Sequence, residues 1–212
     1  MTNKAKPISF KADMVNAILE GRKTQTRRVI DMQDRPHPPM PPSGSVKKWW
    51  QQGHGNGGRG SRDRLFTPPY GLPGDYLWVR ETWSMRSEWD HLPPSLIPEG
   101  EPVFYAAGGG KAGRTRPSIF MPRWASRIDL LVTDVRVERL QDISAGGVVK
   151  EGIPYPPEEL TTDEQITNYL HAGFASLWDS INSKSHPWAS NPWVWVIQFE
   201  RVTRWKSWLI IE

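Results

Sequence analysis

Apolar residues recur at helical spacing in two segments of the chain. In the first, residues 9–20, four apolar side chains fall on one stripe and predict a short helix that Ser9 or Asp13 caps and Gly21 ends. In the second, residues 162–182, apolar side chains follow a 3.6-residue period. This period predicts a long helix with an apolar stripe, formed by Ile166, Tyr169, Leu170, Phe174, Leu177, Trp178 and Ile181.

Four further segments have the composition of strands. Residues 22–30 are rich in Thr and Arg and extend away from the first helix, and residues 76–80 follow a Gly-Asp turn. Residues 126–140 carry the longest strand pattern, but their apolar side chains change parity near residue 133. An extra residue there, a β-bulge, would reset the alternation. Residues 193–201 are apolar on both faces, which predicts a strand covered on both sides, on one of them by the long helix.

A short helix completes the order of elements. Asp142 or Ser144 can cap it, and it ends near Gly152. The chain thus runs from a helix through strands to two helices and a closing strand, an arrangement typical of the α+β class. We expect a single domain over residues 1–203 and a C-terminal tail over residues 204–212.

Two stretches differ in composition from the rest and are predicted to be insertions in this domain. The first, about 31–73, is rich in proline and glycine, which disfavour regular structure. Its Trp49-Trp50 pair lies among lysines and arginines and suits either a flexible arm that binds nucleic acid or a loop with incidental aromatic residues. The second, about 84–116, contains one possible strand at 103–107.

Composition and charge narrow the class of protein only slightly. A formal charge of +4 and a pI near 9.4 favour a polyanionic or nucleotide-like partner. The absence of cysteine excludes disulfides and thiolate chemistry and fits a reducing compartment. No apolar run of about 18 residues predicts a membrane span, and the N-terminus does not have the pattern of a secretory signal. We therefore expect a cytoplasmic protein without a membrane partner.

Twelve tryptophans are many for 212 residues and suit either base stacking or a packed core. We expect core positions for Trp78, Trp178, Trp193 and Trp195, whereas Trp83 and Trp124 suit a core and a binding groove equally. The five histidines are scattered without the spacing of metal ligands, and no phosphate-binding loop or nucleophile elbow is present. We therefore predict neither a metal site nor a cofactor.

The strongest chemical candidate is the segment Lys23-Thr24-Gln25-Thr26-Arg27-Arg28. A lysine whose pKa is lowered by burial can take the proton of a threonine hydroxyl during acyl transfer, provided that a carboxylate holds the amine in place. In a regular strand Lys23 and Thr26 would point to opposite faces, so they meet only if the chain turns after Gly21. The alternative is a basic edge strand whose charges are merely solvated.

Three segments resemble the ASCH domain family, in the form of its longer phage and prophage members. Residues 17–28, AILEGRKTQTRR, resemble the start of these domains, and residues 74–83, GDYLWVRETW, resemble their G-D-x-L strand entry. Residues 117–128, PSIFMPRWASRI, resemble a motif of the longer proteins. The likeness continues over 132–140, 151–153 and 174–182, so it covers most of the chain outside the two insertions. It implies a PUA-like fold, a small mixed β-barrel with flanking helices.

The resemblance also implies an activity. The family's small bacterial members are metal-independent amidohydrolases that act on N4-acetylcytidine and related nucleosides through a Lys, a Thr and a Glu. Their G-x-K-T-x-T-x-R segment corresponds to Lys23 and Thr26 here, and Glu151 is the natural match for the glutamate. Lys23 would deprotonate Thr26, whose oxygen attacks the amide carbonyl. Gly146 and Gly147 would weaken the helix that presents Glu151, by about 1 kcal/mol each relative to alanine.

The expected partner is a modified nucleoside, or single-stranded RNA or DNA. Seven residues of the resembling segments are candidates for binding it: Thr24, Arg27, Arg28, Arg80, Trp83, Arg123 and Trp124. Two other functions remain open for the same basic groove. One is a non-catalytic RNA-binding or nucleic-acid-binding module, and the other is a metal-independent ribonuclease.

Overall fold

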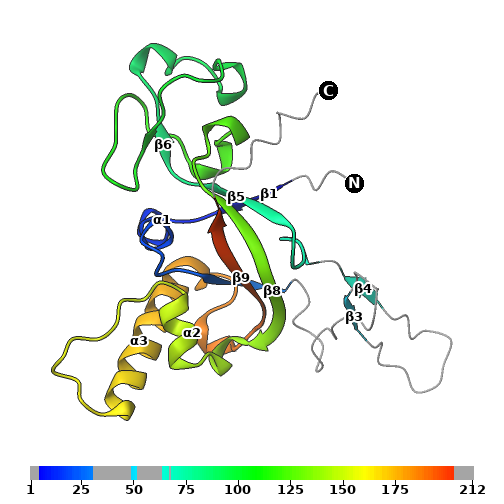
Figure 1. Cartoon of the computed structure of the whole chain (residues 1–212), viewed down its shortest axis with the longest axis vertical. Coiled ribbons are helices and arrows are strands. Elements are labelled where there is room, and N and C mark those ends of the chain that lie inside the picture. Colours follow the sequence, from blue (N-terminus) through cyan, green and yellow to red (C-terminus); the bar gives the residue numbers. More distant parts are fainter. Residues whose placement is uncertain (1–4, 31–48, 52–63, 67, 203–212) are drawn as a thin grey trace.

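The protein has an α+β fold built on one mostly antiparallel sheet, in a computed structural model that describes residues 5–30, 49–51, 64–66 and 68–202 (Figure 1). Within these residues the sheet has five strands in the order β1 (Lys6–Ser9), β5 (Tyr76–Arg80), β8 (Asp129–Arg139), β9 (Trp193–Val202) and β2 (Gln25–Val29). Only β1 and β5 pair in parallel. Among the described residues β1 and β2 are its two edges, so the sheet is not closed.

The long antiparallel pair of β8 and β9 forms the centre of the sheet. Its register shifts between Val132 and Asp134, because β8 holds one more residue there than β9. The β-bulge predicted near residue 133 is therefore confirmed. Val132 and Val135, on either side of the bulge, pack in the same core, although residues three apart in a regular strand point to opposite faces.

Strand β9 is covered on both faces, as its apolar sequence predicts. Val194 and Val196 pack in a cluster with Leu170, Phe174 and Trp178 of helix α3 (Asp163–Asn182). The alternate residues Trp195, Ile197 and Phe199 pack instead with side chains of helix α1 (Ala12–Leu19) and of β1, β5 and β8. Two apolar cores on opposite sides of one strand therefore fix the sheet between the helices.

The helices begin at three different kinds of cap. Thr162 and Gln165 form a capping box at the start of α3, and the Ser144 hydroxyl accepts a hydrogen bond from Gly147 N at the start of α2 (Ala145–Lys150). The prediction for α1 is wrong at its N-terminus. Ser9 is the last residue of β1, the cap is Lys11, and no side chain caps the helix.

The predicted insertion 84–116 forms a unit at the end of the molecule opposite α2 and α3 (Figure 1), where its Met85 and Ile97 share a core with Trp83, Met121 and Ala125. Strand β6 (Trp83–Ser84) pairs with β7 (Phe104–Tyr105), which lies inside the strand predicted at 103–107. The unit's short 3-10 helices are Ser87–Trp89 and Pro94–Leu96, and Ser118–Phe120 and Arg123–Ala125 follow it; two more lie at Leu140–Asp142 and Trp188–Ser190. Its buried side chains pack on Trp78 of β5, which joins the unit to the sheet.

Of the first insertion the structure describes one antiparallel pair, β3 (Trp49–Gln51) with β4 (Arg64–Phe66), and the residues from Pro68 onward. Lys47, Lys48, Arg59, Arg62 and the tail 204–212 lie outside the described residues, as do the side chains of Trp49, Trp50 and Arg64. Within the described residues no helix combines the length and apolarity that crossing a membrane requires.

Candidate active site

A sharp turn after α1 carries Lys23 into the protein. Gly21 adopts φ 77°, which ends the helix, and Lys23 N then donates to Ala17 O at 2.9 Å. Thr24 N donates to Lys150 O in α2, and Thr24 O accepts from Phe199 N in β9, both at 2.9 Å. Strand geometry begins only at Gln25. The side chain of Lys23 is therefore free of the strand alternation that would have separated it from Thr26.

The Lys23 ammonium is fully enclosed and fully hydrogen-bonded. Its side chain is 0% exposed. Nζ donates to the backbone oxygens of Gln25 (2.8 Å) and Glu151 (2.7 Å) and to Glu151 Oε2 (2.8 Å). An ammonium has three protons, so all of its donors are used. The alternative of a merely solvated basic strand is wrong for this residue.

Glu151 lies between two buried cations. It is the C-cap residue of α2 and is 4% exposed. Its Oε2 accepts from Lys23, and its Oε1 accepts from Arg27 Nη1 at 3.0 Å. Arg27, with a side chain 1% exposed, also donates from Nη2 to Glu138 Oε2 at 2.8 Å. The two carboxylates and two cations alternate, so each buried charge has an opposite neighbour.

Two glycines of the α2 region allow this close packing. Gly152 has φ 95°, and a Cβ there would lie 3.0 Å from Ala17 Cβ and 3.2 Å from Lys23 Cβ. A Cβ on Gly147 would lie 3.1 Å from Ile143 Cγ1 and 3.7 Å from Arg27 Nη2. Despite the glycine pair, α2 forms, and it brings Glu151 into contact with Lys23 and Arg27.

Burial has the largest influence on the pKa of Lys23. Loss of hydration lowers its pKa from the ordinary value of 10.5, and the Glu151 carboxylate opposes this shift by attraction and by its hydrogen bond. Repulsion from Arg28 and Arg27 lowers the pKa further. The neutral amine is therefore easier to reach here than on a solvated lysine. A general base of this kind works best when its pKa lies near the working pH.

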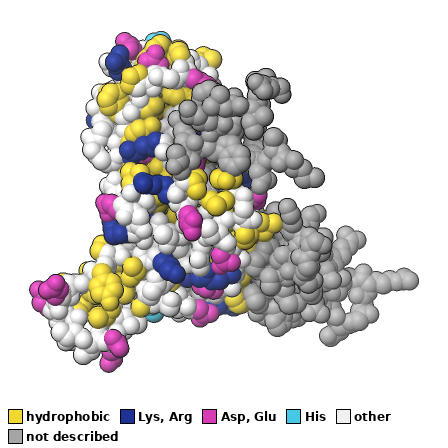
Figure 2. All heavy atoms as spheres, viewed as in Figure 1, with side chains coloured by type: hydrophobic (Ala, Val, Ile, Leu, Met, Phe, Trp, Pro, Cys, Tyr) yellow, Lys and Arg dark blue, Asp and Glu magenta, His cyan; other side chains and the backbone are white. Residues whose placement is uncertain are grey.

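The charged network continues outward along β8. Glu138 also accepts from Arg136, which donates to Asp134 Oδ2 at 3.2 Å and to Gln25 Oε1 at 3.3 Å. Acidic and basic side chains are interleaved on the face seen in Figure 2.

A shallow groove opens beside the buried pair, between β2 and α3. It holds about 50 Å³, which is enough for a few waters or a small acyl group. Its polar wall contains Thr26 and Glu151, and its apolar wall comes mainly from α1 and α3. The lining residues are Met14, Thr26, Arg27, Arg28, Val29, Glu151, Phe174, Leu177, Trp178, Ile181 and Asn182.

The structure joins two of the three predicted catalytic residues directly. Lys23 and Glu151 form an ion pair, whereas Thr26 shares the groove lining with Glu151. In the part of the chain described here no hydrogen bond links the Thr26 hydroxyl to Lys23. Nζ instead bonds Gln25 O, the carbonyl of the peptide unit that leads into Thr26. Any transfer between the two side chains requires that Lys23 first lose a proton.

The predicted binding residues of the same segment have different surroundings. Thr24 is fixed through its backbone to α2 and β9. Arg27 is buried between carboxylates and reaches the groove only as part of its wall. Arg28 also lines the groove, and its guanidinium lies 5.2 Å from the ring centroid of Phe10 and 5.8 Å from that of Tyr70.

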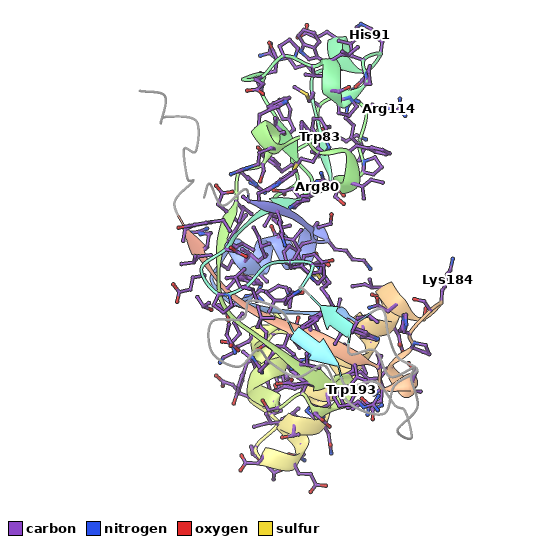
Figure 3. All side chains as sticks on the ribbon, turned by 90° about the vertical axis from the view of Figure 1, so that its right-hand side faces the viewer. Arg80, Trp83, His91, Arg114, Lys184 and Trp193 are labelled. Atoms are coloured by element: carbon purple, nitrogen blue, oxygen red, sulfur yellow. The ribbon has the colours of Figure 1, made fainter. Side chains whose placement is uncertain are left out.

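The other four predicted binding residues do not line this groove. Arg80 lies where the sheet meets the 84–116 unit, and Trp83 immediately precedes that unit (Figure 3). Trp83 is 1% exposed and belongs to the unit's core, which Trp124 flanks. Arg123 is paired with Asp129. Of the four tryptophans expected in the core, Trp78, Trp178 and Trp195 are buried and Trp193 is partly buried.

Sequence reasoning missed Glu138 and Arg136, which hold Arg27 and extend the network. The sequence contained a signal for them. Asp134, Arg136 and Glu138 are two residues apart along the strand, so their charged side chains lie on the same face. The α3 residues of the groove were recognised only as a core stripe. A second ion pair, between the buried Glu81 and the exposed Arg127, was also missed; Arg127 donates to both Glu81 oxygens at 2.9 Å.

Within the described residues no three His, Cys, Asp or Glu side chains form a group that could hold a metal ion. In comparisons with protein-family models, curated proteins and solved structures, nothing matches the chain. The function is therefore argued from the chemistry of Lys23, Glu151 and their surroundings.

Proposed function

We propose that this protein hydrolyses the amide bond of N4-acylated cytosine nucleosides, with Lys23, Thr26 and Glu151 as its catalytic residues. The observation that carries the proposal is the fully buried Lys23–Glu151 pair, in which burial lowers the pKa of the lysine. This pair lies beside a groove that Thr26 and Glu151 line. A lysine held in this way can act as a base for a hydroxyl nucleophile.

In the first proposed step, the neutral Lys23 amine accepts the Thr26 hydroxyl proton while Oγ1 bonds to the substrate carbonyl carbon. The tetrahedral adduct then collapses, the bond from that carbon to cytosine N4 breaks, and the Lys23 ammonium returns its proton to N4. An acyl ester of Thr26 remains. Water attacks this ester with Lys23 again as base, which releases the carboxylic acid and restores the threonine.

Glu151 supports both protonation states of Lys23 in this scheme. Its carboxylate stabilises the ammonium formed in each step, and Arg27 on its other oxygen keeps the carboxylate oriented. Arg28, a partly buried cation of the groove wall, would stabilise the developing oxyanion. The apolar side chains of α3 would surround the acyl group.

The fold assignment belongs to the same proposal. We propose that the sheet is a PUA-like barrel of the ASCH type, whose edge strands are bridged by side chains. The support is the contact of Arg28 Nη2 in β2 with Ser9 O in β1, at 2.8 Å. This bond joins the two edges of the described sheet.

A second function, a nucleic-acid-binding module without catalysis, is favoured by one observation. All three Lys23 protons are donated to Glu151 and Gln25, which is also the arrangement of a purely structural ion pair. In that case the groove would bind a base, and Lys23 would only fix α2 against β2.

Incubation with N4-acetylcytidine, followed by ultraviolet absorbance, tests the first function. We expect turnover by the wild type and loss of at least about 100-fold in Lys23→Met and Thr26→Val, as is usual when a general base or nucleophile is removed. Lys150→Met and Thr133→Val are the matched controls, since both residues are exposed. Absence of wild-type turnover, with salt-sensitive RNA binding, would establish the binding module instead.

A further inference from the structure

A hollow separate from the groove lies in the 84–116 unit, between strand β6 and residues 106–115. It holds about 220 Å³, enough for at least about seven waters. Ser84, Ala106, Lys111 and Thr115 line it, together with Trp83 and two glycines, and none of these residues lines the groove. Because the unit is at the end of the molecule opposite α2 and α3 (Figure 1), a ligand of the hollow would not occupy the groove.

Hydrogen bonds hold the wall of this hollow in shape. Gly113 N donates to Met85 O at 2.6 Å, and Ala112 N donates to Ser84 Oγ at 3.2 Å. Gly109, with φ 78°, forms part of the wall, and a Cβ at this residue would meet no atom within 4 Å. The open space beside the glycine is therefore part of the fold, as is usual for a pocket that exists before its ligand binds.

The lining side chains offer hydrogen-bond donors and one positive charge. Ser84 is 2% exposed, and its Oγ accepts from Ala112 N, so its proton remains to be donated; no acceptor for it is found among the described residues. The Nε1 of Trp83 is likewise buried, without a partner in the same part of the chain. Lys111 is exposed, and none of the lining residues is acidic. Buried donors normally have acceptors, so a ligand that carries acceptor oxygens is the expected complement.

We propose that this hollow binds a small organic carboxylate. The carboxylate oxygens accept hydrogen bonds from the Lys111 ammonium and the Ser84 hydroxyl, and the short carbon chain lies beside Ala106. Hydrogen bonds between ionised groups are stronger than neutral ones, which makes Lys111 the main determinant of affinity. A single cation matches a carboxylate, whereas a phosphate group carries about 1.5 to 2 negative charges near neutral pH. The site does not depend on the hydrolysis that we propose for Lys23 and Thr26.

The test is a titration of the whole chain with butyrate, a carboxylate that fits this volume, followed by ¹H–¹⁵N NMR. The indole N–H signal of Trp83, assigned by its loss in Trp83→Phe, should shift with a Kd in the millimolar range, because few contacts are made. The backbone amide signal of Ala112 is a second reporter that needs no substitution. Lys111→Gln should weaken binding about tenfold, whereas Lys111→Arg should retain it. Ala106→Leu, which fills the hollow, should abolish binding.

Lys184→Gln is the matched control, because Lys184 is exposed and lies outside the 84–116 unit (Figure 3). Its affinity for butyrate should equal that of the wild type, and circular dichroism and the thermal midpoint show that each variant is folded. Equal affinities of the wild type and Lys111→Gln would overturn the proposal, as would equally tight binding of butyramide, the uncharged isostere. Absence of saturation at about 100 mM butyrate would also overturn it. Tighter binding of inorganic phosphate than of butyrate would overturn the assignment to a carboxylate.

Discussion

The buried pair can be tested by its energetic coupling, independently of any substrate. The perturbation is a double-mutant cycle of Lys23→Met, Glu151→Gln and the variant with both substitutions. Each substitution preserves approximate shape and removes one charge. A cycle isolates the interaction between two side chains because effects common to the single variants cancel.

The structure gives the expected magnitudes. Glu151→Gln leaves two enclosed cations, Lys23 and Arg27, facing a neutral amide, so the free energy of unfolding should fall by about 3–5 kcal/mol. Lys23→Met should lower it by about 1–3 kcal/mol, since Glu151 keeps its bond to Arg27. In the double variant Arg27 keeps its ion pair with Glu138. The loss in the free energy of unfolding should therefore be smaller than the sum of the two single-variant losses by more than about 1 kcal/mol.

The assay is urea denaturation followed by tryptophan fluorescence, with the same cycle on Arg22 and Glu20 as the comparison. That pair has side chains 43% and 54% exposed, and its coupling should be below about 0.5 kcal/mol. A Lys23–Glu151 coupling no larger than this surface value would refute the claim that burial makes the pair a strong interaction.

Three further outcomes follow from the site and its glycines. Gly152→Ala should lower the free energy of unfolding by about 1–3 kcal/mol, because residue 152 has a φ of 95°. Gly146→Ala should raise the free energy of unfolding by up to about 1 kcal/mol in the same denaturation assay, because open space surrounds residue 146 in the helix. The pH profile of kcat/KM should rise along a limb with a midpoint below 10.5, and in Glu151→Gln this limb should move to lower pH, because the lost carboxylate had raised the Lys23 pKa. Burial raises the pKa of the Glu81 carboxyl above its usual 4.5. The difference in the free energy of unfolding between the wild type and Glu81→Gln should therefore shift in favour of the wild type as the pH falls from the raised pKa to 4.5.

Each of these outcomes can be contradicted separately. Equal stability of the two glycine variants would show that the left-handed backbone at residue 152 is not strained by a side chain. A limb that stays in place in Glu151→Gln would show that the titrating base is not Lys23. A pH-independent difference between wild type and Glu81→Gln would show that this carboxyl titrates as an ordinary one.

Local patterns predicted much of the fold. The stripe of α3, the Ser144 cap and the two-sided burial of β9 each depend on residues close together in sequence, so the sequence contains their signals. The bulge of β8 was also predictable, because the change of parity at residue 133 is itself a local pattern. The cap of α1 was mispredicted because pairing of Ser9 with Arg80 in the sheet outweighed its capping preference.

The candidate site was only partly predictable, for a physical reason. Lys23 and Arg27 appear in sequence as members of a basic strand, and what buries them is a carboxylate more than 120 positions away. Composition cannot show that α2 packs against this strand only because Gly147 and Gly152 have no side chains that would block the contact. The position of Trp83 depends likewise on how the 84–116 unit folds back on Trp78.

The distance in sequence between Lys23 and Glu151 also matters during synthesis. The two residues are 128 positions apart, and a ribosome adds roughly 5–20 residues per second. For roughly 6 to 26 seconds, therefore, the emerging chain has its lysine but not its glutamate. The groove cannot be assembled in that interval, because α2 and α3, which supply Glu151 and the apolar wall, have yet to be made. A chain interrupted before residue 151 would hold the signature segment without the chemistry that we assign to it.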